Sequence, residues 1–162
     1  MMILPSAHLG LLFLLALALL GCSTTSDQLG FTKVKYYHLK AEDSRAESMS
    51  IDPMLRFERQ HNLHGAVTMA EKRDRWGHYY TIFWNGRLGS DPVKVRFEYR
   101  QSRTGEQVFT HDQVVTDVRN RNKTTLRVTG EPYHRHGLVV AWQASLWQDG
   151  KMLDSTRSFL WK

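Results

Sequence analysis

A strict two-residue alternation between Val93 and Arg100 is the feature that most constrains how this chain can fold. Charged residues separate the apolar Val93, Val95, Phe97 and Tyr99. Successive side chains of a β-strand point to opposite faces, so the pattern predicts a strand with one dry face and one wet face. A dry strand face must be covered by a second layer, which favours a sheet-on-sheet fold.

Several other stretches are rich in β-branched and aromatic residues and predict strands: residues 31–39, 64–70, 78–84, 107–118 and 124–129. Turn signals separate these stretches. Gly and Pro predict a loop over residues 85–92, and Gly105 predicts a hairpin turn over residues 102–105. Residues 40–51 predict a loop, with a short helix over 43–49 as the alternative. Residues 55–60 alternate only weakly, and 71–75 predict a charged turn.

The last hairpin gives an internal test of this interpretation. Asp149-Gly150 is a two-residue turn signal between two β-rich runs. If Gln148 pairs with Lys151, the register places apolar residues opposite one another: Leu146 with Leu153, Val140 with Phe159, and Leu138 with Trp161. The same register places Trp142 opposite Arg157, where a cation–π contact, a salt bridge or simple exposure are all open.

We therefore expect seven to nine strands and an all-β, antiparallel sandwich over residues 31–162, with a small barrel as the alternative. The region from Leu55 to Trp161 resembles immunoglobulin or fibronectin-III-type sandwiches, in which a buried tryptophan such as Trp84 fills the core. Strict alternation assigns one aromatic set to the core: Tyr79, Phe83, Phe97, Tyr99 and Trp142. It assigns Tyr80, Trp84 and Trp147 to the other face, unless a bulge or a second covered face buries them.

The N-terminal segment predicts where the protein is located in the cell. Residues 1–21 contain no Lys, Arg, Asp or Glu, and residues 9–20 form an apolar run that is short for a membrane span. Leu19-Leu20-Gly21-Cys22 resembles the lipobox of bacterial lipoproteins. That resemblance implies cleavage between Gly21 and Cys22 and a diacylglycerol on the Cys22 sulfur. The alternative is an uncleaved anchor that extends back through Ile3.

This resemblance divides the chain into a signal peptide (1–21), a polar tether (22–30) and one domain (31–162). Ser23 is similar to the outer-membrane class of lipoproteins, which implies the periplasmic side of that membrane in a Gram-negative cell. Cys22 is the only cysteine, so a lipidated chain has no thiol left for a disulfide. The eight residues after Cys22 span on the order of 15 Å as a random coil, which keeps the domain near the bilayer.

The net charge of +6 raises the question of an anionic partner. Acidic and basic residues are interspersed along most of the chain, and the densest basic run holds Arg119, Arg121 and Lys123. This run predicts a solvated loop or a contact with anionic lipid, polyanionic glycan or an acidic protein. We expect no nucleic-acid partner, because the chain is exported and carries no reading motif.

No motif in the sequence predicts catalysis or a cofactor. His134 and His136 form an H-x-H pair in a loop bounded by Gly and Pro, but a metal site needs a third ligand. His61 and His64 need a helix to converge, which Gly65 disfavours, and Asp112 and Asp117 are only weak candidates for an acid pair. We expect a non-catalytic, lipid-anchored envelope protein that binds an envelope protein or glycan through loops or a sheet edge. The alternative is a small metal-binding protein or enzyme that uses His134 and His136.

Overall fold

The structure is a computed structural model, and it describes residues 29–41 and 52–162. The expected signal peptide, the tether up to residue 28 and most of the loop over residues 40–51 lie outside the described residues. The described elements, in chain order, are β1 (Gly30–Leu39), α2 (Pro53–Leu63), α3 (Met69–Arg75), β2 (Gly77–Asn85), β3 (Val93–Gln101), β4 (Phe109–Val115), β5 (Arg121–Thr129), α4 (Glu131–His136), β6 (Val139–Gln148) and β7 (Lys151–Arg157).

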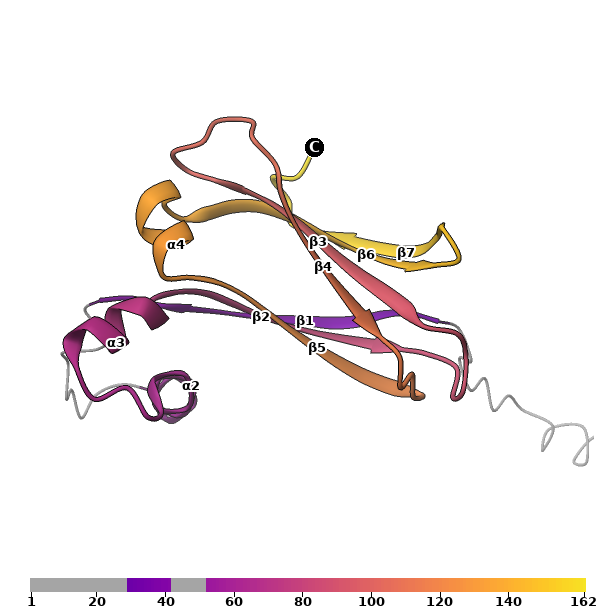
Figure 1. The fold of residues 1–162 in the computed structure, drawn as a ribbon, viewed down its shortest axis with the longest axis horizontal. Coiled ribbons are helices and arrows are strands. Elements are labelled where there is room, and N and C mark those ends of the chain that lie inside the picture. Colours follow the sequence, from indigo (N-terminus) through magenta and orange to yellow (C-terminus); the bar gives the residue numbers. More distant parts are fainter. Residues whose placement is uncertain (1–28, 42–51) are drawn as a thin grey trace, which may run out of the picture.

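The strands form two antiparallel sheets that pack face to face (Figure 1). One sheet has the order β1-β2-β5 and the other has the order β4-β3-β6-β7, so the chain crosses between layers after β2, β4 and β5. The predicted all-β sandwich is confirmed, and the sheets do not close into a barrel. The first, second and fifth strands share one sheet, as in immunoglobulin domains, but β4 pairs with β3 instead of β5.

The core lies between the sheets and is built from alternate residues of each strand. In β3 the predicted dry face is confirmed, because Val93, Val95 and Phe97 are almost fully buried. Across the gap they meet Tyr80, Ile82 and Trp84 from β2 and Leu126 from β5. Ala144 and Leu146, from the neighbouring strand β6, lie beside them in the same sheet. Burial of these apolar side chains supplies the main free energy of folding, since the chain has no disulfide to help.

The prediction for β2 had the two faces the wrong way round. Tyr80 and Trp84 are 1% exposed in the core, whereas Tyr79 and Phe83 lie on the outer face of the sheet. Both alternate sets of this strand contain aromatic residues, so hydrophobicity alone does not choose between them. The buried Trp84 is confirmed, and its indole N–H donates to the Thr124 hydroxyl on β5 at 3.1 Å.

The β6–β7 hairpin has the predicted turn but a different register beyond it. Asp149 and Gly150 both have positive φ, and Gln148 pairs with Lys151 as expected. An irregularity between Leu146 and Trp147 pairs Leu146 with Asp154, so the predicted pairing of Leu146 with Leu153 is wrong. The predicted pairs of Val140 with Phe159 and Leu138 with Trp161 are also wrong, because β7 ends at Arg157 and Phe159 is 96% exposed.

Two consequences follow from this one-residue shift. Arg157 pairs with Gln143 instead of Trp142, and the tryptophan packs against the core. Asp154, opposite a core leucine, points between the sheets, where its Oδ2 accepts the backbone N–H of Phe31 at 2.7 Å. This bond joins the start of β1 to β7 and fixes where the chain enters the sandwich.

Helix α2 contains the weakly alternating residues 55–60. The predicted strand over 64–70 and the predicted charged turn over 71–75 are wrong, because these residues form the connection between the helices and α3 itself. The Asp52 carboxylate caps α2 by accepting the Met54 N–H, and Pro53 occupies its first turn. Thr68 and Glu71 form a reciprocal capping box at the start of α3.

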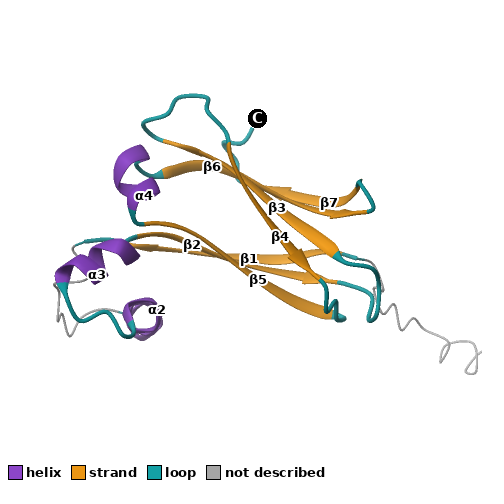
Figure 2. Cartoon of the chain, viewed as in Figure 1, coloured by secondary structure: helices purple, strands orange, loops and turns teal. Residues whose placement is uncertain are grey.

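No helix among the described residues is long and apolar enough to cross a membrane. Helices α2 and α3 lie against the outer side of the three-stranded sheet (Figure 2).

We expect Thr124→Val to lower the free energy of unfolding by about 1–3 kcal/mol, because it leaves the buried indole N–H of Trp84 without an acceptor. Thr125→Val is the matched control, since Thr125 is the exposed neighbour on the opposite face of β5. Urea unfolding monitored by tryptophan fluorescence measures both. Equal losses in the two variants would contradict the assigned faces of β5.

Candidate anion-binding face

Charge is divided unevenly between the two sheets. The strands β1, β2 and β5 contain no Asp or Glu, but they carry five cations: Lys33, Lys35, Arg121, Lys123 and Arg127. The strands of the other sheet also carry five Lys or Arg residues, but these are accompanied by Glu98, Asp112 and Asp154. The charge that looked interspersed along the sequence is therefore segregated in the fold.

All five cations point away from the core, and all are exposed. The register explains this, since residues directly opposite one another in a sheet share a face. Lys33, Phe83 and Lys123 are aligned across the three strands, and Asn85 lies between Gly30 and Arg121 in another row. Since Tyr80, Ile82 and Trp84 face the core, these rows must face out. We call the five cations the basic face.

The half-buried ring of Phe83 lies at the centre of the basic face. The Nζ atom of Lys35 is 5.7 Å from the centroid of this ring, which is within the range of a cation–π contact. Neighbouring strands are about 4.8 Å apart, so Lys33 and Lys123 on either side of Phe83 have Cα atoms about 10 Å apart. The face thus offers several positive charges around one apolar ring.

No carboxylate neutralises the basic face among the described residues. The ion pairs found in this part of the chain lie elsewhere, at Arg96 and Lys94 with Asp112, Arg100 with Glu106, and Arg119 with Asp117. Cations crowded on one sheet face repel one another, which costs stability when nothing opposes them. An anionic partner would relieve that repulsion, and the exposed side chains are free to reach it.

The predicted basic run is split by the structure. Arg121 and Lys123 belong to β5 and to the basic face, so they are not in a loop as one interpretation held. Arg119 lies in the loop before β5, and its guanidinium donates to the Asp117 carboxylate at 2.6 Å. Sequence reasoning missed Lys33, Lys35 and Arg127, although the absence of acids from three β-rich stretches was a visible signal.

The weak candidate acids Asp112 and Asp117 have separate structural partners. Asp112 on β4 accepts two hydrogen bonds from Arg96, each 2.8 Å long. These bonds lower the pKa of the Asp112 carboxyl below its ordinary value. Asp117 pairs with Arg119, so the structure does not bring the two carboxylates together as an acid pair.

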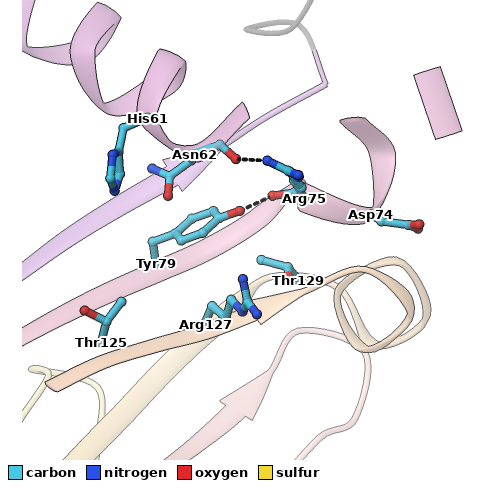
Figure 3. A pocket seen from close by; sticks show the side chains of 8 residues that line it. All are labelled: His61, Asn62, Asp74, Arg75, Tyr79, Thr125, Arg127 and Thr129. Carbon is cyan, nitrogen blue, oxygen red and sulfur yellow. Dashed lines mark hydrogen bonds between the residues drawn. The ribbon is translucent and has the colours of Figure 1, made fainter. Parts of the chain in front are cut away.

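A pocket of about 690 Å³ lies at the end of the outer face that α2 and α3 cover (Figure 3). The Arg75 guanidinium donates to the carbonyls of Asn62 and His64 at the end of α2, and the Tyr79 hydroxyl donates to the Arg75 carbonyl at 2.6 Å. Burial raises the pKa of Tyr79, although Arg127 and Arg75 oppose this effect. The lining of the pocket is polar, and Asp74 is the single carboxylate in it. The lining residues are His61, Asn62, Asp74, Arg75, Tyr79, Thr125, Arg127 and Thr129.

The histidine pairs are not arranged as metal ligands. His134 and His136 lie on the six-residue helix α4, where a loop was predicted, because Gly130 and Gly137 with positive φ bound a short helical turn. His134 hydrogen-bonds the Arg73 carbonyl, whereas the His136 ring packs on Phe109. Helix α2 does form despite Gly65, but it ends before His64. Within the described residues, no three His, Cys, Asp or Glu side chains gather as a possible metal site.

A buried histidine joins the two sheets near α4. His78 is 2% exposed, stacks on His38 with ring centroids 4.2 Å apart, and contacts the Tyr36 hydroxyl through Nδ1 at 2.8 Å. Its Nε2 accepts the backbone N–H of Val139, so the neutral ring carries its proton on Nδ1. Burial, with a smaller effect from His38, lowers the pKa of His78 to about 3.

Comparisons with known proteins add no relative to this picture. No family model matches the chain, and no curated protein and no solved structure matches it. The fold and the face therefore define the protein by architecture alone, as an all-β sandwich with one acid-free basic sheet face.

We expect acid to destabilise the fold through His78. This histidine is neutral when folded and has a pKa of about 6.5 when unfolded, so the unfolded state binds more protons between about pH 6.5 and 3. The contribution of neutral His78 to the free energy of unfolding is fully present above about pH 6.5. Below that pH it falls by about 1.4 kcal/mol per pH unit.

His78→Gln removes this titration, and His111→Gln, at an exposed position of the edge strand β4, is the matched control. Urea unfolding at about pH 7.5 and about pH 5 gives the slopes, which are compared instead of absolute stabilities. The His78 variant should lose less stability than the parent between the two conditions. The same pH slope in parent and variant would contradict a buried neutral His78.

Proposed function

We propose that this chain is a lipid-anchored, non-catalytic binding domain of the bacterial cell envelope, and that it binds an anionic component through the basic face. The observation that carries the binding role is a three-stranded sheet with five exposed cations and no carboxylate. Clustered like charges without counter-charges raise the local concentration of anions at that surface. The proposed binding surface is thus a sheet face and not the loops or sheet edge expected from the sequence.

The anchor part of the proposal rests on the lipobox-like residues Leu19 to Cys22. A thioether-linked diacylglycerol on Cys22 and an acylated amine supply the two lipid attachments that stable anchoring requires. With Ser23 in the next position, the outer membrane of a Gram-negative cell is the proposed location, with the domain on the periplasmic side.

The alternative of a metal-binding protein or enzyme at His134 and His136 gains no support from their contacts. The His134 ring is occupied by the Arg73 carbonyl, and the His136 ring is packed against Phe109. A metal at Nε2 of His134 would have to displace this hydrogen bond, and a site would still need a further ligand.

In cells, we expect Cys22→Ser to abolish incorporation of labelled palmitate and to leave a precursor that is longer by the signal peptide. The reason is that only a thiolate serves as the nucleophile for the thioether. Ser23→Ala is the control, and it should keep the label. Mass spectrometry of the parent protein should find lipidated Cys22 as the first residue, and an unmodified thiol there would refute the anchor.

We expect the mature chain, residues 22–162 with Cys22→Ser, to be retained on immobilised dextran sulfate through the basic face. Replacing Lys33, Lys35 and Lys123 by Gln should shift elution to clearly lower salt, because each lysine lost removes one released counterion. The charge-matched control replaces Lys151, Arg157 and Lys162, which are exposed but lie outside the basic face. An equal shift in both triple variants would show that only total charge matters.

A further inference from the structure

We infer that the anionic component is the phosphate surface of the bilayer that carries the anchor, so that the side of the protein formed by the basic face and helices α2 and α3 rests on the membrane. This inference deepens the proposed function and rests on its anchored state. Three features of this side point to a lipid surface: the charge of the strands, the place where the chain enters, and the apolar side chains of the helices.

The chain enters the domain at the open end of the basic face. Gly30 begins β1 in the same row as Asn85 and Arg121, and the next outward-facing row holds Lys33 and Lys123. Gly30 lies eight residues after Cys22, and eight fully extended residues reach at most about 28 Å. A lipid at Cys22 therefore holds these cations within reach of headgroups, where the local concentration of phosphate is high.

The other end of the same side exposes apolar residues. Helices α2 and α3 cover that end of the sheet (Figures 1 and 3). In α2, Met54 is 65% exposed and Phe57 is 61% exposed, and Val67 in the connection to α3 is 81% exposed. Apolar side chains beside cations suit the boundary between headgroups and acyl chains. A soluble polyanion would use the cations but would give these apolar groups no partner.

The opposite side of the sandwich differs in that carboxylates engage its central cations, although Lys151 and Arg157 on β7 and the apolar Val114 and Met152 are exposed there as well. On the outer face of the four-stranded sheet, Arg96 and Lys94 are engaged by Asp112, and Arg100 is engaged by Glu106. Those cations are neutralised within the protein, so they attract a phosphate surface less strongly. The asymmetry assigns the three-stranded sheet to the membrane and leaves the four-stranded sheet facing away from it.

The first test is flotation of the mature Cys22→Ser chain with lipid vesicles. It should bind phosphatidylcholine vesicles that contain about one-third phosphatidylglycerol, and it should not bind pure phosphatidylcholine. Replacing Lys33, Lys35 and Lys123 by Gln should weaken binding on the order of 100-fold, since each cation contributes about five-fold. The control triple at Lys151, Arg157 and Lys162 should bind like the parent, and equal weakening would overturn the assignment of the face.

The second test separates a bilayer from a soluble polyanion. Phe57→Ser should weaken vesicle binding several-fold while retention on dextran sulfate stays unchanged. Phe159→Ser is the control, because Phe159 is 96% exposed at the other end of the chain, after β7. A Phe57→Ser variant that binds vesicles as well as the parent would overturn the role of the apolar side chains.

The third test uses the anchored arrangement itself. Coupling the single thiol of Cys22 to a maleimide lipid attaches the parent chain to anionic vesicles at its natural position. Acetylation followed by mass spectrometry should then show Lys33, Lys35 and Lys123 protected relative to Lys151 and Lys162. Uniform acetylation would overturn the docked orientation.

The bilayer as partner and the anchored binding function can fail separately in these experiments. Retention on dextran sulfate through the basic face, together with no binding to anionic vesicles, would overturn the bilayer as partner and leave a polyanionic glycan as the component of the proposed function. An unmodified Cys22 in cells would overturn the anchored function itself, whatever the vesicle measurements show.

Discussion

The packing of two sheets around Trp84, Tyr80 and Phe97 is the constraint on which the rest of this structure depends. Tyr80 and Phe97, from opposite sheets, have ring centroids 4.7 Å apart, and Trp84 satisfies its indole N–H on Thr124. A strand that turns one set of side chains inward must turn the other set outward. Core formation therefore also decides which residues form the outer surface. The cations of the basic face point outward because the alternate residues of the same strands are buried in the core.

The outer surface of the three-stranded sheet carries cations that no carboxylate of its strands opposes. Cations on β1 and β5 flank Phe83 with no acid among the strand residues to oppose them, whereas on the four-stranded sheet Asp112 engages Lys94 and Arg96. Repulsion within the basic face lowers stability slightly, and the core offsets that cost. Natural sheets usually place opposite charges across strands, so an unopposed face points to a role outside the fold.

The sequence was most informative where one alternate set of residues is apolar and the other is polar. It predicted the sandwich and β3 because Val93 and Val95 alternate with charged residues. The predictions were wrong for β2, where both alternate sets contain aromatic residues, and for α3, although Thr68 and Glu71 have the spacing of a capping box. The sequence did not predict the hairpin irregularity between Leu146 and Trp147, since a bulge depends on tertiary contacts such as the Asp154 bond to β1. The basic face emerged only from the strand order, because β1 and β5 are far apart in sequence.

The central claim is that the outer face of β1-β2-β5 carries a positive electrostatic potential that the opposite face lacks. Nuclear magnetic resonance with paired cationic and anionic paramagnetic cosolutes measures that potential residue by residue, in the absence of any partner. The anionic probe should enhance relaxation near Lys33, Phe83 and Lys123 much more than the cationic probe, and the two probes should act similarly near Arg96. Similar potentials on both faces of the sandwich would contradict the account.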